Sequence, residues 1–233
     1  MNNEFRSLSS EAVDEPRSIN KTLLTISGPR WHIMSKRGFD IVGAFVLILF
    51  FLPFMLLVAL ALIIADGRPI LYSHTRIGRE GVPFGCLKFR TMLASGDRLL
   101  QERLSNDPAM CAEWMAIRKL KNDPRVHPVG RFLRRASLDE LPQLFNVLIG
   151  EMSLVGPRPV IQAEIKEYGN KVGYYLALRP GITGLWQVSG RSDTSYRERV
   201  DLDERYFNEQ SLLLDMRILF RTLRVVLLAR GAY

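Results

Sequence analysis

Cysteine and histidine are scarce in this chain, and neither is spaced like the ligands of a metal centre. The two cysteines, Cys86 and Cys111, lack the short spacing of a zinc site. They also give no support to a disulfide framework, which fits a reducing compartment. His32, His74 and His127 form no cluster along the sequence. Glycine-rich loops of the Walker or dinucleotide-binding type are absent as well, so neither class of nucleotide-binding protein is indicated.

Lysine is scarce relative to arginine. Of the 32 basic residues, 25 are Arg and 7 are Lys, and with 24 acidic residues the formal net charge is +8. The planar guanidinium of Arg can bind phosphate or carboxylate through two parallel hydrogen bonds. The codon usage of a GC-rich genome explains the same excess equally well. The composition is therefore compatible with a protein that binds anions, without requiring one.

The chain has a single long hydrophobic run, at residues 41–65, which contains no charged side chain. One such run excludes a polytopic transporter, and its presence excludes a purely soluble basic protein such as a simple nucleic-acid binder. As a helix rising 1.5 Å per residue, the run would reach about 37 Å, beyond the roughly 30 Å of a hydrocarbon core. It is too long, and begins too far into the chain, for a signal peptide.

Two features of this run favour a helix that enters and leaves the same face of a membrane. Pro53, at its centre, removes a backbone hydrogen bond and kinks or breaks a helix. Positive charge lies on both flanks, which places both ends in the cytoplasm. The flanking cations are Lys36 and Arg37 before the run, and Arg68, Arg76, Arg79, Lys88 and Arg90 after it. We expect a re-entrant membrane helix over residues 36–66; an ordinary kinked span is the alternative.

The remaining patterns divide the chain into three regions. Residues 1–35 are polar and lack apolar periodicity, which predicts a mobile N-terminal tail. The membrane helix covers 36–66, and a cytoplasmic domain covers 67–233. Short strands are predicted at 69–72, 84–89 and 186–188, a turn at 179–184, and helices at 95–121, 137–148, 160–172, 195–208 and 212–230. The expected fold class is therefore α+β and mainly helical.

The last predicted helix is both basic and apolar. Arg217, Arg221 and Arg224 fall on one helical face, and no acidic residue follows Asp215. A basic amphipathic helix of this kind often lies on an anionic membrane surface. A core helix with one solvated Arg face explains the pattern as well.

The strongest candidates for chemistry are the neighbouring carboxylates Asp139 and Glu140. Ser137 followed by Glu140 ahead of an apolar run is typical of a capping box, which is the simpler interpretation. Arg134 lies just before this pair, and Arg158 follows in a proline-rich loop. Arg side chains at a helix N-terminus form a favourable phosphate site. In such a site, one carboxylate can attack phosphorus and the other can hold Mg²⁺.

Other cations lie in short, stiff segments. Arg158 stands between two prolines at residues 156–159, and Arg179 precedes Pro-Gly, so both guanidinium groups are presented by restricted backbones. Lys88 and Arg90 share one face of a predicted strand, with Phe89 on the other. Each of these residues alone is more often an ordinary surface residue. Their occurrence around a carboxylate pair favours an anion site.

Five motifs occur in order, and together they resemble a known family. They are Lys36-Arg-Gly-Phe-Asp40 before the proline-broken run, Lys88-Phe-Arg-Thr-Met92, Ser137-Leu-Asp-Glu-Leu-Pro-Gln-Leu-Phe-Asn146, Gly156-Pro-Arg-Pro159 and Arg179-Pro-Gly-Ile-Thr-Gly184. Over about residues 35–233 the chain resembles the bacterial sugar transferases, which are monotopic polyprenyl-phosphate phosphoglycosyl transferases. It is most similar to the short members that initiate exopolysaccharide synthesis. It departs from the family at the helix break, where Leu52 replaces the frequent Ser.

The resemblance implies a two-step reaction at the cytoplasmic face of the bacterial inner membrane. Asp139 would attack the sugar-bearing phosphate of a UDP-sugar and release UMP, and undecaprenyl phosphate would then take the phosphosugar from Asp139. Glu140 would bind Mg²⁺. The implied phosphate-binding residues are Lys88, Arg90, Arg134, Arg158 and Arg179. Galactose or glucose is favoured as the sugar.

The same resemblance implies a monotopic fold with amphipathic helices on the membrane surface, and a cytoplasmic catalytic domain at 67–233. The implied partners are the UDP-sugar, undecaprenyl phosphate and anionic inner-membrane lipid, with room for an oligomer and no role for nucleic acid. Two other classes of function remain open from the residues alone. A non-catalytic membrane adaptor would use the basic surface but not the Asp-Glu pair, and a membrane glycosyltransferase would release UDP in place of UMP.

Overall fold

The computed structural model describes residues 30–93, 95–117, 120, 123–190 and 194–227. In this part of the chain, helices dominate, and four short strands form two separate two-stranded sheets. The fold class predicted from the sequence, mainly helical α+β, is therefore confirmed. Residues 1–29 of the predicted tail and 228–230 of the last predicted helix lie outside the described residues.

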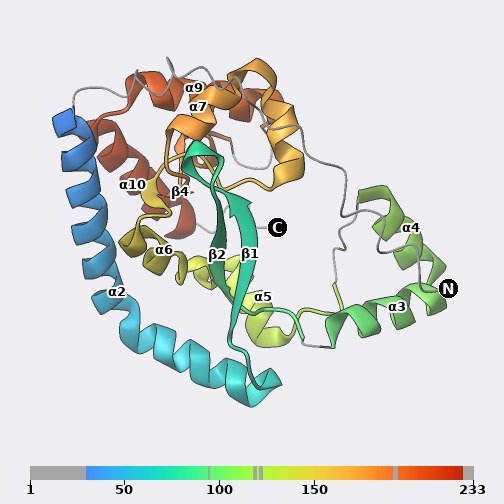
Figure 1. The fold of residues 1–233 in the computed structure, drawn as a ribbon. Coiled ribbons are helices and arrows are strands. Elements are labelled where there is room, and N and C mark those ends of the chain that lie inside the picture. Colours follow the sequence, from blue (N-terminus) through green and yellow to red (C-terminus); the bar gives the residue numbers. More distant parts are fainter. Residues whose placement is uncertain (1–29, 94, 118–119, 121–122, 191–193, 228–233) are drawn as a thin grey trace.

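The longest element is α2 (Arg30–Asp66), which contains the apolar run. It begins at Arg30, upstream of the predicted start at residue 36. Figure 1 shows that its axis changes direction about midway, where the colour passes from blue to cyan. Pro53 lies inside this helix. A proline inside a helix removes one backbone hydrogen bond and kinks it. The segment Met34–Asp66 is long and apolar enough to cross a membrane.

The first sheet is an antiparallel hairpin of β1 (Leu71–Ile77) and β2 (Pro83–Phe89). Its turn contains η2 (Arg79–Gly81), where Glu80 and Gly81 have φ of 60° and 79°. The strand predicted at 84–89 is confirmed in β2, whereas the strand predicted at 69–72 overlaps only the start of β1. Alternation holds only for the first part of β2, where Phe84 and Cys86 are buried; at its end Lys88, on the same face, is half-buried and Phe89, on the other face, is buried.

The second sheet pairs β3 (Ser153–Val155) with β4 (Gly181–Thr183) in parallel. A Cβ on Gly181 would lie 2.1 Å from the backbone nitrogen of Gly156, so this close pairing requires glycine. The strand predicted at 186–188 is wrong, because these residues form the short helix α8 (Leu185–Ser189). The predicted turn at 179–184 supplies a strand instead, since its backbone pairs with β3.

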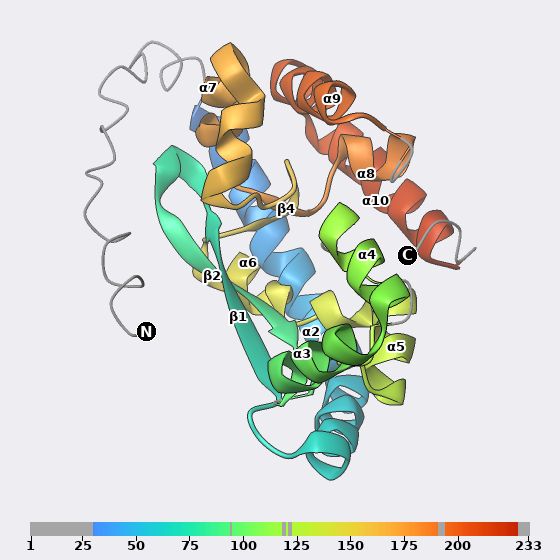
Figure 2. The same cartoon turned by 90° about the vertical axis from the view of Figure 1, so that its right-hand side faces the viewer.

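Helices surround the two sheets. They are α3 (Gly96–Asn106), α4 (Pro108–Ile117), α5 (Pro128–Arg135), η3 (Leu138–Glu140), α6 (Gln143–Ile149), η4 (Gln162–Lys171), α7 (Val172–Ala177), α9 (Tyr196–Glu209) and α10 (Leu212–Leu227). Figures 1 and 2 place α3 and α4 on the opposite side of the hairpin from α2. The predicted helix at 195–208 is confirmed by α9, and the helix predicted at 160–172 is largely the 3₁₀ helix η4.

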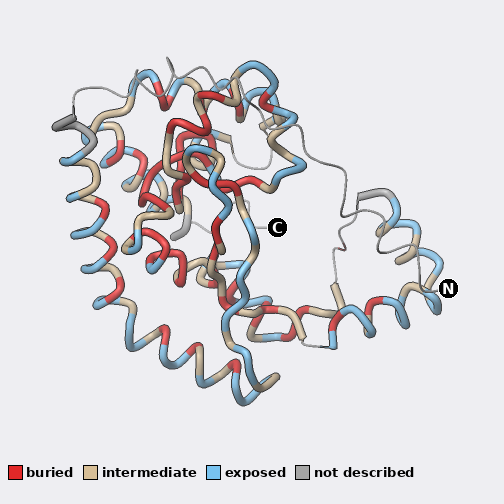
Figure 3. Tube along the Cα trace, in the orientation of Figure 1, coloured by how far each residue is buried: buried red, intermediate tan, exposed pale blue. Residues whose placement is uncertain are grey.

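The largest hydrophobic cluster joins α2 to the rest of the molecule. It contains Ala44 and Ile48 of α2, Phe84 of β2, Val147 of α6 and Leu154 of β3. Figure 3 shows buried residues gathered around the sheets and exposed ones along the outer side of α2. The apolar run is thus amphipathic in its contacts: one side packs on the body and the other leaves large apolar side chains exposed.

A buried network of charged groups fixes the start of α2. Lys36 Nζ lies 3.2 Å from Asp40 Oδ1 and 3.0 Å from Asp215 Oδ2 of α10. It also donates a hydrogen bond to Ser153 Oγ of β3 at 2.7 Å. The Tyr206 hydroxyl donates to Asp215 at 2.7 Å. The carboxylates of Asp40 and Asp215 are almost fully buried, with side-chain exposures of 2% and 1%. Lys36, which the sequence predicts as a cation flanking the apolar run, therefore pairs with buried carboxylates of the body.

Arg37 is also engaged with the body. Its guanidinium donates hydrogen bonds to the carbonyl oxygens of Val147 and Leu148, at 2.6 and 2.8 Å. These carbonyls belong to the last turn of α6, where a cation is favoured by the helix dipole. At the other end of α2, Arg90 Nη2 lies 2.9 Å from Asp66 Oδ2. Both ends of the long helix are therefore tied to the same body.

Candidate active site

Asp139 and Glu140 lie in η3, between α5 and α6. The capping box predicted at residues 137–140 is wrong. Ser137 adopts a left-handed conformation with φ of 55°, and its side chain forms no cap hydrogen bond. Left-handed backbone is uncommon outside glycine, and it recurs at functional sites. This turn leaves the Glu140 side chain to contact β2 rather than the backbone before the helix.

Glu140 is held by a lysine from the hairpin. Lys88 Nζ lies 2.5 Å from Glu140 Oε1, and Gln143 also donates a hydrogen bond to this carboxylate. Burial by itself would raise the pKa of Glu140. The charges of Lys88 and Arg158 outweigh that effect, and the pKa of Glu140 falls below its usual value. Glu140 is therefore ionised in the free protein.

Asp139 is the more buried member of the pair, with 9% of its surface exposed. Burial raises the pKa of Asp139, and the neighbouring Glu140 raises it further. Lys88 and Arg134 act in the opposite direction without cancelling the rise. A weakly hydrated carboxylate of raised basicity is suited to attack an electrophile, because little water has to be displaced from it.

Arg134 of α5 is positioned by the end of the hairpin. Its Nε donates a hydrogen bond to Thr91 Oγ1 at 2.7 Å. Burial lowers the pKa of Arg134, while the charge of Asp139 opposes the change. The backbone of α5 approaches Thr91 so closely that a Cβ on Gly130 would lie 2.3 Å from the Thr91 carbonyl oxygen. Thr91 thus fixes both the helix and its guanidinium beside Asp139.

Thr91→Val is expected to reduce kcat/KM by at least about tenfold, because hydrogen bonds to charged groups contribute roughly 1.5–3 kcal/mol. The substitution keeps the β-branched shape but removes the hydroxyl that orients Arg134. Steady-state kinetics with the sugar donor and a melting curve measure the effect. Thr91→Ser should restore most of the rate, and a Val variant with unchanged kinetics would show that the hydroxyl has no positioning role.

Arg158 lies near enough to the same site for its charge to act on Glu140. It is exposed between the buried Pro157 and Pro159, and its charge contributes to the lowered pKa of Glu140. The loop is held by hydrogen bonds from the Gly156 amide to Thr183 and from the Gly181 amide to Pro157. A stiff loop therefore presents this guanidinium, as the sequence predicts.

Arg90 and Arg179, which the sequence predicts to bind phosphate, make contacts away from the two carboxylates. Besides its ion pair with Asp66, Arg90 donates hydrogen bonds to the Asp66 and Gly67 carbonyl oxygens, at 2.9 and 3.1 Å. Arg179 Nε donates to the Gly150 carbonyl oxygen at 2.9 Å, and burial together with the charge of Arg79 lowers its pKa. The structure brings Lys88, Arg134 and Arg158 to the carboxylates. For Arg90 and Arg179, a phosphate-binding role stays a prediction.

Sequence reasoning missed Gln143 and Asn146, both buried in α6. Asn146 Oδ1 accepts a hydrogen bond from the Leu87 amide, and its Nδ2 donates to the Gly85 carbonyl oxygen. These contacts hold α6 against β2 and so bring Glu140 to Lys88. The spacing of three residues from Glu140 to Gln143 on one helical face is a signal that could have identified the glutamine.

The site fits a magnesium ion only if the substrate supplies ligands. Among the described residues, no three His, Cys, Asp or Glu side chains come together in a way that could hold a metal. Mg²⁺ is commonly bound by one or two carboxylates together with substrate phosphates and water. Asp139 and Glu140, beside three cations that can hold phosphates, match that requirement.

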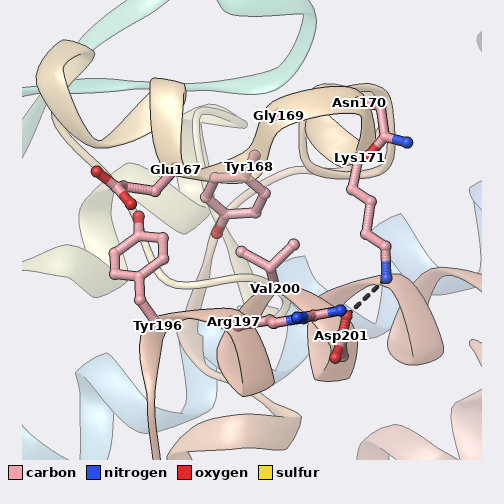
Figure 4. A pocket seen from close by; sticks show the side chains of 9 residues that line it. All are labelled: Glu167, Tyr168, Gly169, Asn170, Lys171, Tyr196, Arg197, Val200 and Asp201. Carbon is pink, nitrogen blue, oxygen red and sulfur yellow. Dashed lines mark hydrogen bonds and ion pairs between the residues drawn. The ribbon is translucent and has the colours of Figure 1, made fainter.

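A separate pocket of about 380 Å³ lies between η4 and α9 (Figure 4). Lys171 bridges Asp201 and Glu204 at its edge, with both distances 2.6 Å. The Tyr168 hydroxyl donates to Asp203 at 2.8 Å, and burial raises the pKa of Asp203 to about 7. None of the predicted site residues lines this pocket. Its polar groups hold η4 against α9.

Similarity to known proteins extends over most of the chain. The chain is 50% identical over 200 residues to the exopolysaccharide production protein ExoY of Rhizobium meliloti (strain 1021), covering 86% of this chain and 88% of that protein. It is 50% identical over 198 residues to an undecaprenyl-phosphate galactose phosphotransferase of Salmonella typhimurium, covering 85% of this chain and 41% of the relative.

A third relative, a UDP-glucose:undecaprenyl-phosphate glucose-1-phosphate transferase of Caulobacter vibrioides, is 41% identical over 208 residues, covering 86% of this chain and 72% of the relative. Residues 31–229 match the family described as bacterial sugar transferase. The match includes the apolar helix, the hairpin with Lys88, and the turn with Asp139 and Glu140. The chain therefore belongs to the bacterial sugar transferase family.

Proposed function

We propose that this enzyme transfers a hexose 1-phosphate, from galactose or glucose, from a UDP-sugar to undecaprenyl phosphate, as the first membrane step of exopolysaccharide synthesis. The observation that carries the proposal is the buried Asp139 beside an ion-paired Glu140, with Arg134 and Arg158 close by. Relatives with 50% identity bear names that describe exopolysaccharide production and this phosphotransfer. An adaptor protein would have no use for this arrangement.

The reaction proceeds in two displacements at one phosphorus atom. The Asp139 carboxylate attacks the sugar-bearing phosphate, the bond to the bridging oxygen breaks, and UMP leaves with that oxygen. An oxygen of undecaprenyl phosphate then attacks the phosphosugar held on Asp139 and releases the carboxylate. Arg134 and Arg158 stabilise the negative charge that builds on the phosphoryl oxygens in both steps.

Magnesium would be held by Glu140 and by phosphate oxygens of the substrate. When bound, it would neutralise phosphate charge and so ease attack by an anionic carboxylate. Lys88 contacts the same carboxylate, and its charge also acts on Asp139. Lys88 is thus the cation that can exchange between Glu140 and the substrate.

A panel of labelled UDP-sugars with undecaprenyl phosphate tests the function. We expect UDP-galactose or UDP-glucose to give UMP and a lipid-linked product that carries the sugar and two phosphates. Release of UDP would indicate a glycosyltransferase that moves the sugar without its phosphate. No turnover with any donor in the panel would favour the adaptor.

We further propose that α2 is re-entrant and that the body lies on the cytoplasmic face of the bacterial inner membrane. Support comes from the bend in α2 and from the ties at its two ends, through Lys36 to Asp215 and through Asp66 to Arg90. A helix held to one body at both ends cannot cross a bilayer with that body on a single side. The exposed apolar side chains of α2 would then lie in one leaflet.

The C-terminal helix α10 supports the same placement. Leu213, Phe220 and Leu223 are 61%, 66% and 56% exposed, and Arg217 and Arg221 lie beside them. A core helix would bury these apolar side chains. An exposed stripe of apolar residues flanked by Arg is suited to the interface of an anionic membrane.

Cysteine labelling tests the topology. We expect Arg30→Cys and Arg68→Cys to react with an impermeant maleimide in inverted membrane vesicles, and to stay unlabelled in intact spheroplasts. A Cys111→Ser background is needed because Cys111 is partly exposed, whereas Cys86 is buried. Labelling of only one introduced cysteine in spheroplasts would show that α2 crosses the membrane, and labelling of both would contradict the cytoplasmic face.

A further inference from the structure

Building on the proposed function, we propose that Lys88 closes the metal site of the free enzyme and makes metal binding depend on the sugar donor. Its ammonium occupies Glu140 until the diphosphate of a UDP-sugar draws it away. Mg²⁺ would then bind together with the donor, and only weakly before it. The order of binding is therefore set by a side chain of this protein.

The contact with Glu140 carries this inference. Lys88 Nζ lies 2.5 Å from Glu140 Oε1, and each side chain is 24% exposed. Gln143 donates a further hydrogen bond to the same carboxylate. A magnesium ion binds carboxylate oxygen at about 2.1 Å and keeps a rigid shell of six ligands. A metal at Glu140 would have to displace the ammonium or lie against it, and two cations at one carboxylate repel each other.

Lys88 can leave Glu140 without disturbing the fold. Its backbone is fixed in β2, where it pairs with Tyr72, and the next residue, Phe89, is buried. The four-carbon side chain is flexible and carries three rotatable donors. Arg134 cannot exchange in this way, because Thr91 holds its guanidinium. Lys88 is therefore the movable cation of the site, and Arg134 is a fixed one.

The charges of the site match such an exchange. Asp139 and Glu140 face three cations, Lys88, Arg134 and Arg158. This arrangement attracts a diphosphate and repels a free divalent cation. A complex of Mg²⁺ with the diphosphate of the donor is close to neutral. It would deliver the metal to Glu140 and a phosphate oxygen to Lys88 in a single step.

Metal binding to the full-length protein in detergent tests the proposal, with Mn²⁺ as the probe and without sugar donor. We expect Lys88→Met to bind Mn²⁺ at least about tenfold more tightly than the unchanged protein, as measured by the paramagnetic resonance signal of free Mn²⁺. The double variant Lys88→Met, Glu140→Gln should lose that gain. Lys171→Met is the matched control, because Lys171 forms equally short ion pairs away from the site.

A second measurement adds UDP to both the unchanged protein and Lys88→Met. We expect UDP, which carries the diphosphate without a sugar to transfer, to tighten Mn²⁺ binding by the unchanged protein at least about tenfold more than it does in Lys88→Met. Equal Mn²⁺ affinity of the two proteins without UDP, or weaker binding by Lys88→Met, would overturn the proposal. These results stand apart from turnover: failure to release UMP from any UDP-sugar contradicts the proposed function, whatever the metal affinities.

Discussion

Asp139→Asn is expected to lower the rate of UMP release from the sugar donor by at least about a thousandfold, even when no undecaprenyl phosphate is present. An amide oxygen is a far weaker nucleophile than a carboxylate, while its size is the same. Omitting the lipid isolates the first displacement, because UMP then leaves in a single burst and the phosphosugar stays on the protein. Intact-mass measurement should find that adduct in the unchanged protein and not in the variant.

Asp123→Asn is the matched control for this experiment. The Asp123 carboxylate also interacts with Arg134 through its charge, but Arg125 binds both of its oxygens, at 2.9, 3.1 and 2.7 Å. We expect this variant to release UMP at a burst rate within about tenfold of that of the unchanged protein, provided that its melting curve shows a folded protein. A full burst from Asp139→Asn would refute the assignment of the nucleophile.

Two copies of one local pattern show how far the sequence could predict the fold. Ser195 and Glu198 form a capping box at the start of α9, as the pattern of Ser followed three residues later by Glu predicts. Ser137 and Glu140 have the same pattern and form no box. The difference is Lys88, which lies 52 residues from Glu140 in sequence and binds its carboxylate. A tertiary contact overrides the local preference, and it does so at the candidate site, where such exceptions are expected.

The predicted strand at 186–188 failed for a related reason. Trp and Val favour strands because they pack well on a pleated surface, and this preference depends strongly on context. Here Trp186 is buried in α8, with the guanidinium of Arg199 4.7 Å from its ring centroid. The strand in this region is β4, which comes just before α8 in the sequence, and Gly181 permits its close pairing with β3.

The candidate site was predicted as a set of residues, but not as a set of neighbours. Nothing in the spacing of Lys88 and Arg90 indicates that one cation binds Glu140 and the other binds Asp66 at the end of α2. Arg90 lies just beyond β2, which ends at Phe89, so the shared strand face of these two cations stays a prediction. The ion-pair partners of Lys88 and Arg90 depend on how the hairpin packs between α2 and η3. That packing is determined by the whole fold.

The contacts of the cations that flank the apolar run also depend on the tertiary fold, and this dependence can be tested. Lys36→Met should destabilise the protein by about 3–5 kcal/mol, because it leaves the buried carboxylates of Asp40 and Asp215 without their cation. For a chain of this size the loss corresponds to a fall in Tm of roughly 10 °C. Thermal unfolding of the protein in detergent, followed by circular dichroism, measures it.

Arg68→Met is the matched control, since Arg68 flanks the other end of the run and is exposed. We expect its Tm to stay within about 2 °C of the unchanged protein, because a single exposed charge contributes little to stability. Adding Asp215→Asn to Lys36→Met should recover part of the loss, since it removes one uncompensated charge. If Lys36→Met melts like Arg68→Met, then Lys36 acts only as a flanking charge, and the start of α2 is held by its apolar packing on β3 and α6.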